Sequence, residues 1–228
     1  MTAMAASRTA KSSPPRPRPR KRTSTAAAAG KREDILGVAT KAFAASGFDG
    51  VRLHEIARAA RMNQATLVYY FPSKRALYEA CLTDAAARLM EAFAEGTRAT
   101  DGRSAAEAIV GALLDRFART PELGRLIRQA TLRGGVEFER SFVRPLRPWF
   151  ERGVVALERA MDEGLIARQD AEELVLILYG AILIYLSEDP LVTGLTGKDP
   201  RAPRNLKRHQ RFVLESAARL LDPRHDGS

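Results

Sequence analysis

The chain has 228 residues with a formal net charge of +10, and apolar residues make up 45% of them. Its one cysteine, Cys81, excludes an intrachain disulfide and a zinc site built on cysteines, and it favours a reducing compartment. The longest apolar run, Leu174 to Leu186, is too short to cross a bilayer, so we expect a cytoplasmic protein without membrane insertion.

The excess positive charge is concentrated at the N-terminus. Residues 1–32 hold nine Lys or Arg and no acid, whereas the rest of the chain holds 28 cations and 27 acids. Residues 1–29 contain the run PPRPRPRKR and show no apolar periodicity. This composition predicts a disordered basic arm. Such an arm is equally typical of a solvated tail and of a segment that contacts phosphates or a minor groove.

A helical pattern begins at Lys31. Apolar residues recur every four positions at Ile35, Ala39 and Phe43. Gly47 is placed to end this helix, and Phe48 to fold back on Phe43.

Three further helices follow after short breaks. The second has one apolar face, made by Leu53, Ile56, Ala57 and Ala60. Asn63 is a good N-cap for a third helix from Gln64 to Phe71, which Pro72 ends. Ser73 caps a fourth helix from Lys74, with a buried stripe predicted at Tyr78, Leu82, Ala85, Leu89 and Phe93.

This order of helices, with a tight break between the second and third, is typical of a helix-turn-helix DNA-binding domain, which we place at residues 30–78. Leu67, Tyr70 and Phe71 share one face of the third helix and are expected to pack inward. The other face is small and nearly uncharged, as entry into a major groove requires. The predicted DNA contacts on and after this helix are Gln64, Ala65, Thr66, Val68, Tyr69, Tyr70 and Lys74.

Each of these contacts has a chemical reason. Gln64 can pair with adenine, and Thr66 can reach a base edge or a phosphate. Tyr69 and Tyr70 can direct hydroxyl groups at phosphate oxygens. Lys74 adds a positive charge where the free N–H groups of the fourth helix also attract a phosphate.

Residues 79–222 are expected to form an all-helical second domain, followed by a tail at 223–228. Its helix breaks are predicted near residues 96–102, 120–121, 134–135, 144–148 and 164–169. Pro145 and Pro148 are expected to interrupt their helix and to favour a pocket there.

The run from Leu174 to Leu186 is apolar on every side, so it needs cover on two faces. A second copy of the chain is the simplest partner, and a fully buried helix in a monomer is the alternative. A last helix, about residues 203–221, carries an apolar stripe. The residues predicted for a dimer interface are Leu174, Leu178, Ile182, Tyr185, Val213, Ala217 and Leu220.

The run IARAARMNQATLVYYFPSKRAL, preceded by AFAASGFDGVRLHEIA, resembles the TetR family of bacterial transcriptional regulators. The positions that carry the resemblance are Gly47-Phe48, Ile56-Ala57, Leu67, Tyr70-Phe71 and Lys74. It implies an all-α fold, in which a three-helix helix-turn-helix domain is joined by a long helix to a helical ligand-binding and dimerisation domain. It also implies a homodimeric repressor that binds a double-stranded DNA operator and responds to a small-molecule effector.

The family pattern is not matched everywhere. Arg52 stands where a hydroxyl residue usually caps the second helix, so it is a candidate phosphate contact, with Asp49 as a substitute cap. Arg61 replaces the turn glycine, which predicts either a distorted turn or an arginine that reaches the DNA backbone. Asn63 replaces a serine, and Val68 replaces a tyrosine and offers a contact to a thymine methyl group.

The resemblance also implies a ligand cavity in the second domain. Aromatic side chains are its candidate lining, with ordinary core packing as the alternative for each. The residues are Phe93, Phe117, Phe142, Trp149 and Phe150.

Little in the sequence favours an enzyme. His54, His209 and His225 lack metal-ligand spacing, and there is no phosphate-binding glycine loop, so we expect no catalytic residue, metal or cofactor. Two other functions stay open at this point. One is a non-specific nucleic-acid-binding protein that uses its basic arm, with the body as a dimerisation module. The other is a peripheral membrane or multidrug-sensing adaptor without DNA affinity.

Overall fold

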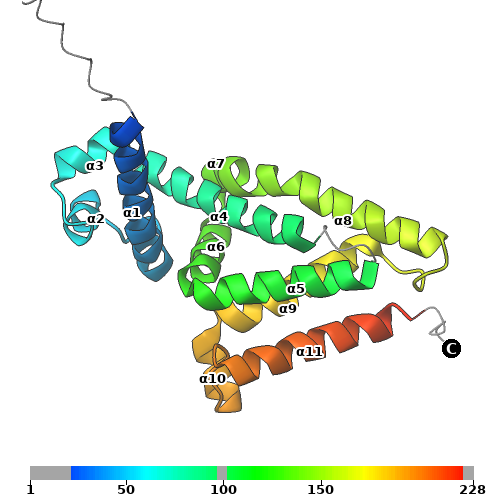
Figure 1. The fold of residues 1–228 in the computed structure, drawn as a ribbon. Coiled ribbons are helices and arrows are strands. Elements are labelled where there is room, and N and C mark those ends of the chain that lie inside the picture. Colours follow the sequence, from blue (N-terminus) through cyan, green and yellow to red (C-terminus); the bar gives the residue numbers. More distant parts are fainter. Residues whose placement is uncertain (1–21, 97–101, 223–228) are drawn as a thin grey trace, which may run out of the picture.

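The computed structural model describes residues 22–96 and 102–222, and over these ranges it contains helices and no strand. Three helices form a small head at one end, α4 runs from the head into the body, and the other helices make up the body (Figure 1). The all-α prediction is therefore confirmed. The elements are α1 (Arg22–Ser46), α2 (Leu53–Ala59), α3 (Gln64–Tyr70), α4 (Lys74–Gly96), α5 (Gly102–Arg119), α6 (Pro121–Arg133), α7 (Gly135–Phe138), the π-helical turn η1 (Glu139–Val143), α8 (Arg144–Asp162), α9 (Ala171–Ser187), α10 (Asp189–Thr196) and α11 (Pro203–Leu220).

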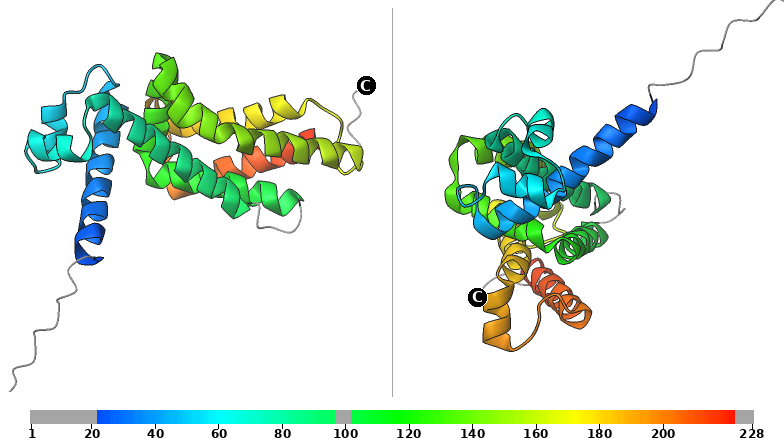
Figure 2. Two further views of the ribbon diagram at one scale, coloured as in Figure 1. Left: turned by 90° about the horizontal axis from the view of Figure 1, so that it is seen from above. Right: turned by 90° about the vertical axis from the view of Figure 1, so that its left-hand side faces the viewer.

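Helix α1 begins at Arg22, earlier than the sequence suggested. Residues 22–29 were expected to belong to a disordered arm, but they form the first turns of α1, because the run of alanines there favours helix. This end of α1 projects away from the rest of the molecule (Figure 2). The remainder of the predicted arm, residues 1–21, lies outside the described residues.

The head is held together by side chains from all three of its helices. Ile35, Phe43 and Leu67 are fully buried, and Ile56 is nearly so. Gly47 ends α1 with a φ of 67°, and the Phe48 ring then stacks on Phe43 with 6.2 Å between centroids. The predicted end of the first helix is confirmed.

Helix α4 carries the core from the head into the body. Its predicted stripe is buried at Tyr78, Leu82, Ala85 and Leu89, and one continuous apolar cluster extends from Ile35 in α1 to Val213 in α11. The head therefore does not fold around a core of its own. Its orientation depends on the helices of the body that pack against α1 and α4.

The body confirms most of the predicted helix breaks and contradicts one. Pro145 and Pro148 do not interrupt their helix, because both lie within α8. The irregularity lies just before it, in η1, where the Arg144 N–H donates to the carbonyl of Glu139 five residues back. This wider turn changes the hydrogen-bonding pattern ahead of the two prolines, whose nitrogens cannot donate.

The described part of the chain contains no single helix that is long and apolar enough to span a membrane. Helices α9 and α10 pass that test only as a pair, and they are bent by 82° relative to each other.

Candidate nucleic-acid interface

The turn between α2 and α3 sets the direction of α3. Arg61 has a φ of 53°, the left-handed conformation that usually requires glycine. Its N–H donates to the Arg58 carbonyl at 3.0 Å, and the Met62 N–H donates to the Ala57 carbonyl at 3.0 Å. These two bonds make a complete Schellman end to α2. The turn is therefore formed in the ordinary way, and the expected distortion at Arg61 is not present.

Asn63 caps α3 as predicted. Its Oδ1 accepts the Thr66 N–H at 2.7 Å. The cap of α2 differs from the expectation, because Glu55, and not Asp49, supplies the carboxylate. Glu55 Oε2 accepts the Arg52 N–H at 3.0 Å. The Arg52 side chain is left exposed beside the start of α2.

Helix α3 separates an inward from an outward face. Leu67 is fully buried and Phe71, directly after the helix, is 3% exposed, whereas Tyr69 is 83% exposed. Gln64, Ala65 and Val68 are exposed as well, so these three and Tyr69 share a free surface. The two remaining predicted contacts on this helix, Thr66 and Tyr70, are half-buried. The Tyr70 ring packs against the core and lies edge-on to Tyr69, with 5.4 Å between centroids.

The side chain of Lys74 is half-buried and contacts other residues of the head. Its Nζ lies 4.5 Å from the centroid of the Phe48 ring and donates to the Asp49 carbonyl at 3.5 Å. Ser73 caps α4 as predicted, because its Oγ accepts the Ala76 N–H at 3.0 Å. Lys74 thus lies in the first turn of α4, shortly after the end of α3, but its ammonium group contacts the turn that follows α1.

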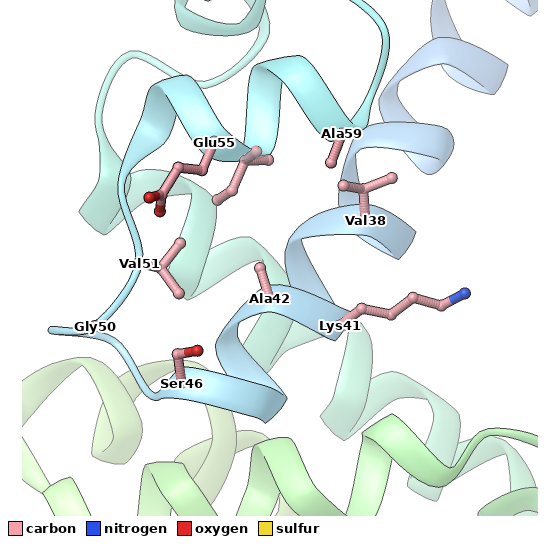
Figure 3. A pocket seen from close by; sticks show the side chains of 9 residues that line it. Val38, Lys41, Ala42, Ser46, Gly50, Val51, Glu55 and Ala59 are labelled. Atoms are coloured by element: carbon pink, nitrogen blue, oxygen red, sulfur yellow. The ribbon is translucent and has the colours of Figure 1, made fainter.

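A hollow of about 470 Å³ lies between α1 and α2 (Figure 3). Its walls are mainly small apolar side chains, and Lys41 lies at its edge. None of the aromatic residues predicted to line a ligand cavity is part of it. Sequence reasoning did not anticipate this hollow.

The five aromatic residues predicted for the ligand cavity are found at several places in the body. Phe93 stacks on Trp149 with 6.4 Å between centroids, and Phe142 stacks on Phe138 at 5.3 Å. Phe117 is buried and packs against Gly124. Phe150 is half-buried. Core packing accounts directly for Phe117 and Phe142.

The residues predicted for a dimer interface require a correction. Leu174, Ile182 and Val213 are buried within the chain and cannot form a surface, because they pack α9 and α11 onto the body. Leu178, Tyr185 and Ala217 are half-buried, and Leu220 is exposed. Apart from Leu220, the large apolar side chains that face outward on these two helices were not predicted. They are Leu176, Ile177, Tyr179 and Ile184 on α9, and Phe212 on α11.

The titratable groups of the described ranges lack the grouping that a metal site needs. No group of three or more His, Cys, Asp or Glu residues there could hold a metal ion. Burial raises the pKa of the Cys81 thiol to about 12, which keeps it protonated and unreactive at neutral pH.

The two halves of the chain match known protein-family models. Residues 35–81 match the model of bacterial regulatory proteins of the TetR family, and residues 103–216 match that of a tetracyclin repressor-like C-terminal domain. The HTH-type transcriptional regulator RutR of Escherichia coli (strain K12) is 26% identical over 192 residues, which cover 81% of this chain and 89% of RutR. The HTH-type transcriptional repressor NicS of Pseudomonas putida is 30% identical over 111 residues, covering 48% of this chain and 52% of NicS.

Solved structures share the fold. AibR, in complex with isovaleryl coenzyme A and operator DNA, superposes with a TM-score of 0.69 at 16% identity, covering 82% of this chain and 97% of AibR. The putative transcriptional regulator SCO4942 from Streptomyces coelicolor has a TM-score of 0.66 at 21% identity, covering 84% of this chain and 98% of that chain.

Proposed function

The chain belongs to the TetR family of helix-turn-helix transcriptional regulators. We propose that it is a cytoplasmic homodimeric repressor that binds an operator through α3 and responds to a small molecule held in the body. The observation that carries this proposal is the outward face of α3. Tyr69 is 83% exposed there although Leu67, two residues earlier, is fully buried. A ring held in solvent on a rigid, capped helix is available to a partner outside the chain.

Helix α3 has the dimensions and chemistry of a recognition helix. Gln64 lies at its N-terminus, where a recognition helix contacts base edges, and its amide can bond the N6 and N7 atoms of adenine. Val68 offers its methyl groups to a thymine. Tyr69 on this surface, Arg52 at the start of α2 and Lys74 at the start of α4 are assigned to phosphates.

A homodimer supplies the second reading head. Two half-sites on DNA lie about one helical turn, or roughly 34 Å, apart, which a two-fold pair of heads can match. The exposed apolar side chains of α9 and α11 support a second copy as the partner, because an apolar surface of this kind is costly to leave in water.

A small-molecule effector is assigned to the body. AibR, which shares this fold, binds isovaleryl coenzyme A as well as operator DNA. In the present chain the effector would bind among the body helices and shift the balance between two orientations of the heads. The alternative of a non-specific nucleic-acid-binding protein is not favoured, since both halves match a family of transcriptional regulators.

The test separates base reading from phosphate binding. Selection from a random duplex library should return one motif with the wild-type protein. Gln64→Ala should relax that motif, whereas Lys74→Ala should weaken binding to every duplex and lower the salt slope by about 0.9 for each phosphate contact that is lost. Lys198→Ala, an exposed lysine beyond α10, serves as the matched control and should change neither. If the wild-type protein selects no motif, the proposed function is wrong.

A further inference from the structure

A chain of alternating charges crosses the junction between head and body. Arg133, the last residue of α6, has its Nε 3.8 Å from Asp49 Oδ2 in the head and its Nη1 3.6 Å from Glu137 Oε2 in α7. Glu137 also pairs with Arg75 of α4 at 2.6 Å. Arg75 and Arg140 both pair with Glu79. Arg133 is thus a body residue whose charge reaches the turn after α1.

The same turn holds the side chain of Lys74. The guanidinium carbon of Arg133 lies 4.3 Å from the centroid of the Phe48 ring, and Lys74 Nζ lies 4.5 Å from it. Both cations also contact Asp49, Arg133 through the carboxylate and Lys74 through the backbone carbonyl at 3.5 Å. One ring and one acidic residue are therefore shared by a cation of the body and a cation of the head.

Because Arg133 and Lys74 both lie beside Asp49, the ion pair with Arg133 decides which cation the Asp49 carboxylate binds. Its side chain is 86% exposed, and Arg133 is its ion-pair partner in the described part of the chain. Without Arg133, the nearest cation to this turn would be Lys74, which would then be held by the carboxylate and withdrawn from other anions.

We propose that Arg133 is a positioning residue for DNA binding, which neutralises Asp49 and shares the Phe48 ring so that the Asp49 carboxylate does not capture Lys74, whose ammonium group remains able to bind a phosphate. This inference rests on the proposed function. It adds that a residue of the body, which itself need not touch DNA, sets the charge that the head presents to the DNA backbone.

The inference is tested by DNA affinity in a mutant cycle. The probe is the duplex selected by the wild-type protein, and binding is measured by fluorescence anisotropy over a range of salt concentrations. Exposed ion pairs contribute up to about fivefold in an equilibrium constant, and the losses at two heads multiply, so Arg133→Ala should weaken binding by up to about 25-fold in a dimer with two heads. Arg119→Ala is the control, because Arg119 is an exposed arginine that pairs within its own helix with Asp115, and it should leave the affinity unchanged.

Combining Arg133→Ala with a substitution of Asp49 or Lys74 distinguishes a positioning role of Arg133 from a purely structural one. In the Asp49→Asn background, Arg133→Ala should have less than a twofold effect, because no carboxylate remains to capture Lys74. In the Lys74→Ala background it should likewise have little effect and leave the salt slope as it is. Equal losses in all three backgrounds, or no loss in the wild-type background, overturn the inference. A wild-type protein that binds no duplex overturns both this inference and the proposed function, whereas sequence-specific binding with additive losses overturns this inference alone.

Discussion

Arg61 occupies a backbone position that suits glycine better than arginine. Its φ of 53° completes the Schellman end of α2, and a non-glycine residue in this conformation costs roughly 1–2 kcal/mol. The loss of backbone entropy that glycine suffers on folding offsets part of that cost. We expect Arg61→Gly to raise the free energy of unfolding by about 1 kcal/mol, measured by urea denaturation. Arg58→Gly removes the same side chain within helix α2 and should lower it by about 1 kcal/mol.

A loss of stability from Arg61→Gly would show that the left-handed conformation carries no strain at this position. Loss of operator affinity in Arg61→Gly with unchanged or raised stability would show instead that this arginine contacts the DNA backbone, the second expectation drawn from the sequence.

Single side chains on α3 could be assigned from the sequence because their positions depend on helical periodicity alone. Leu67 and Phe71 lie four residues apart on the buried face, and Tyr69 lies between them on the other face. The location of Lys74 could not be assigned in this way. It depends on Phe48 and Asp49, which are 26 and 25 residues away along the chain and reach Lys74 only through the packing of α1 against α4.

Elements α6, α7 and the start of α4 meet at Glu137, whose carboxyl group is nearly buried. A hydrogen bond from its own backbone N–H, and the guanidinium groups of Arg75 and Arg133, lower the pKa of Glu137 below its ordinary value. A lowered pKa in the folded state gives stability that is complete above the unfolded-state pKa of about 4.3 and is lost as the pH falls through the folded-state value.

We therefore expect Glu137→Gln to lower the melting temperature at neutral pH and to lower it less as the pH falls below about 4. The measurement is the difference between the two melting curves at each pH, which removes the effects of other carboxylates common to both proteins. A difference that stays constant from neutral to acidic pH would show that Glu137 acts through shape and hydrogen bonding and not through its charge.

The helices show which of their features can be predicted from local sequence signals and which cannot. The ends of α1, α5 and α6 follow from Gly47, Pro121 and Gly134, because these residues disfavour a continued helix locally. Proline wrongly predicted a break in α8, because Pro145 lies in its first turn, directly after the π-helical turn, and Pro148 lies within the helix. The outward face of α9 could not be predicted, because the helix is apolar on every side and its orientation is decided by contacts with α5, α6 and α8.

At the scale of the whole molecule, head and body share one core, so a change in the body can reach the head without a separate hinge. The apolar cluster runs from Ile35 to Val213, and Gly47 at the end of α1 lies within 3.4 Å of the Gln129 side chain of α6, measured from the position that a Cβ would take. In the proposed homodimer, this packing would restrict the pair of heads to the orientations that the body permits. Operator recognition would then depend on the assembly of two bodies as well as on α3.

The assembly is tested on the outward face of α9. Ile177 is 55% exposed, and in a two-fold pair each copy would place it in the shared apolar surface. Ile177→Glu would bury two unpaired carboxylates there, so we expect the dissociation constant of the dimer to rise by more than a hundredfold, with operator affinity falling in parallel. Sedimentation velocity over a range of protein concentrations measures the first effect and fluorescence anisotropy the second. Leu132→Glu alters a 72% exposed leucine on α6 and should leave the dimer intact. If both variants remain dimeric and bind DNA equally well, the second reading head must be brought in by another surface, whereas a folded monomer with Ile177→Glu alone would show that α9 brings the two heads together.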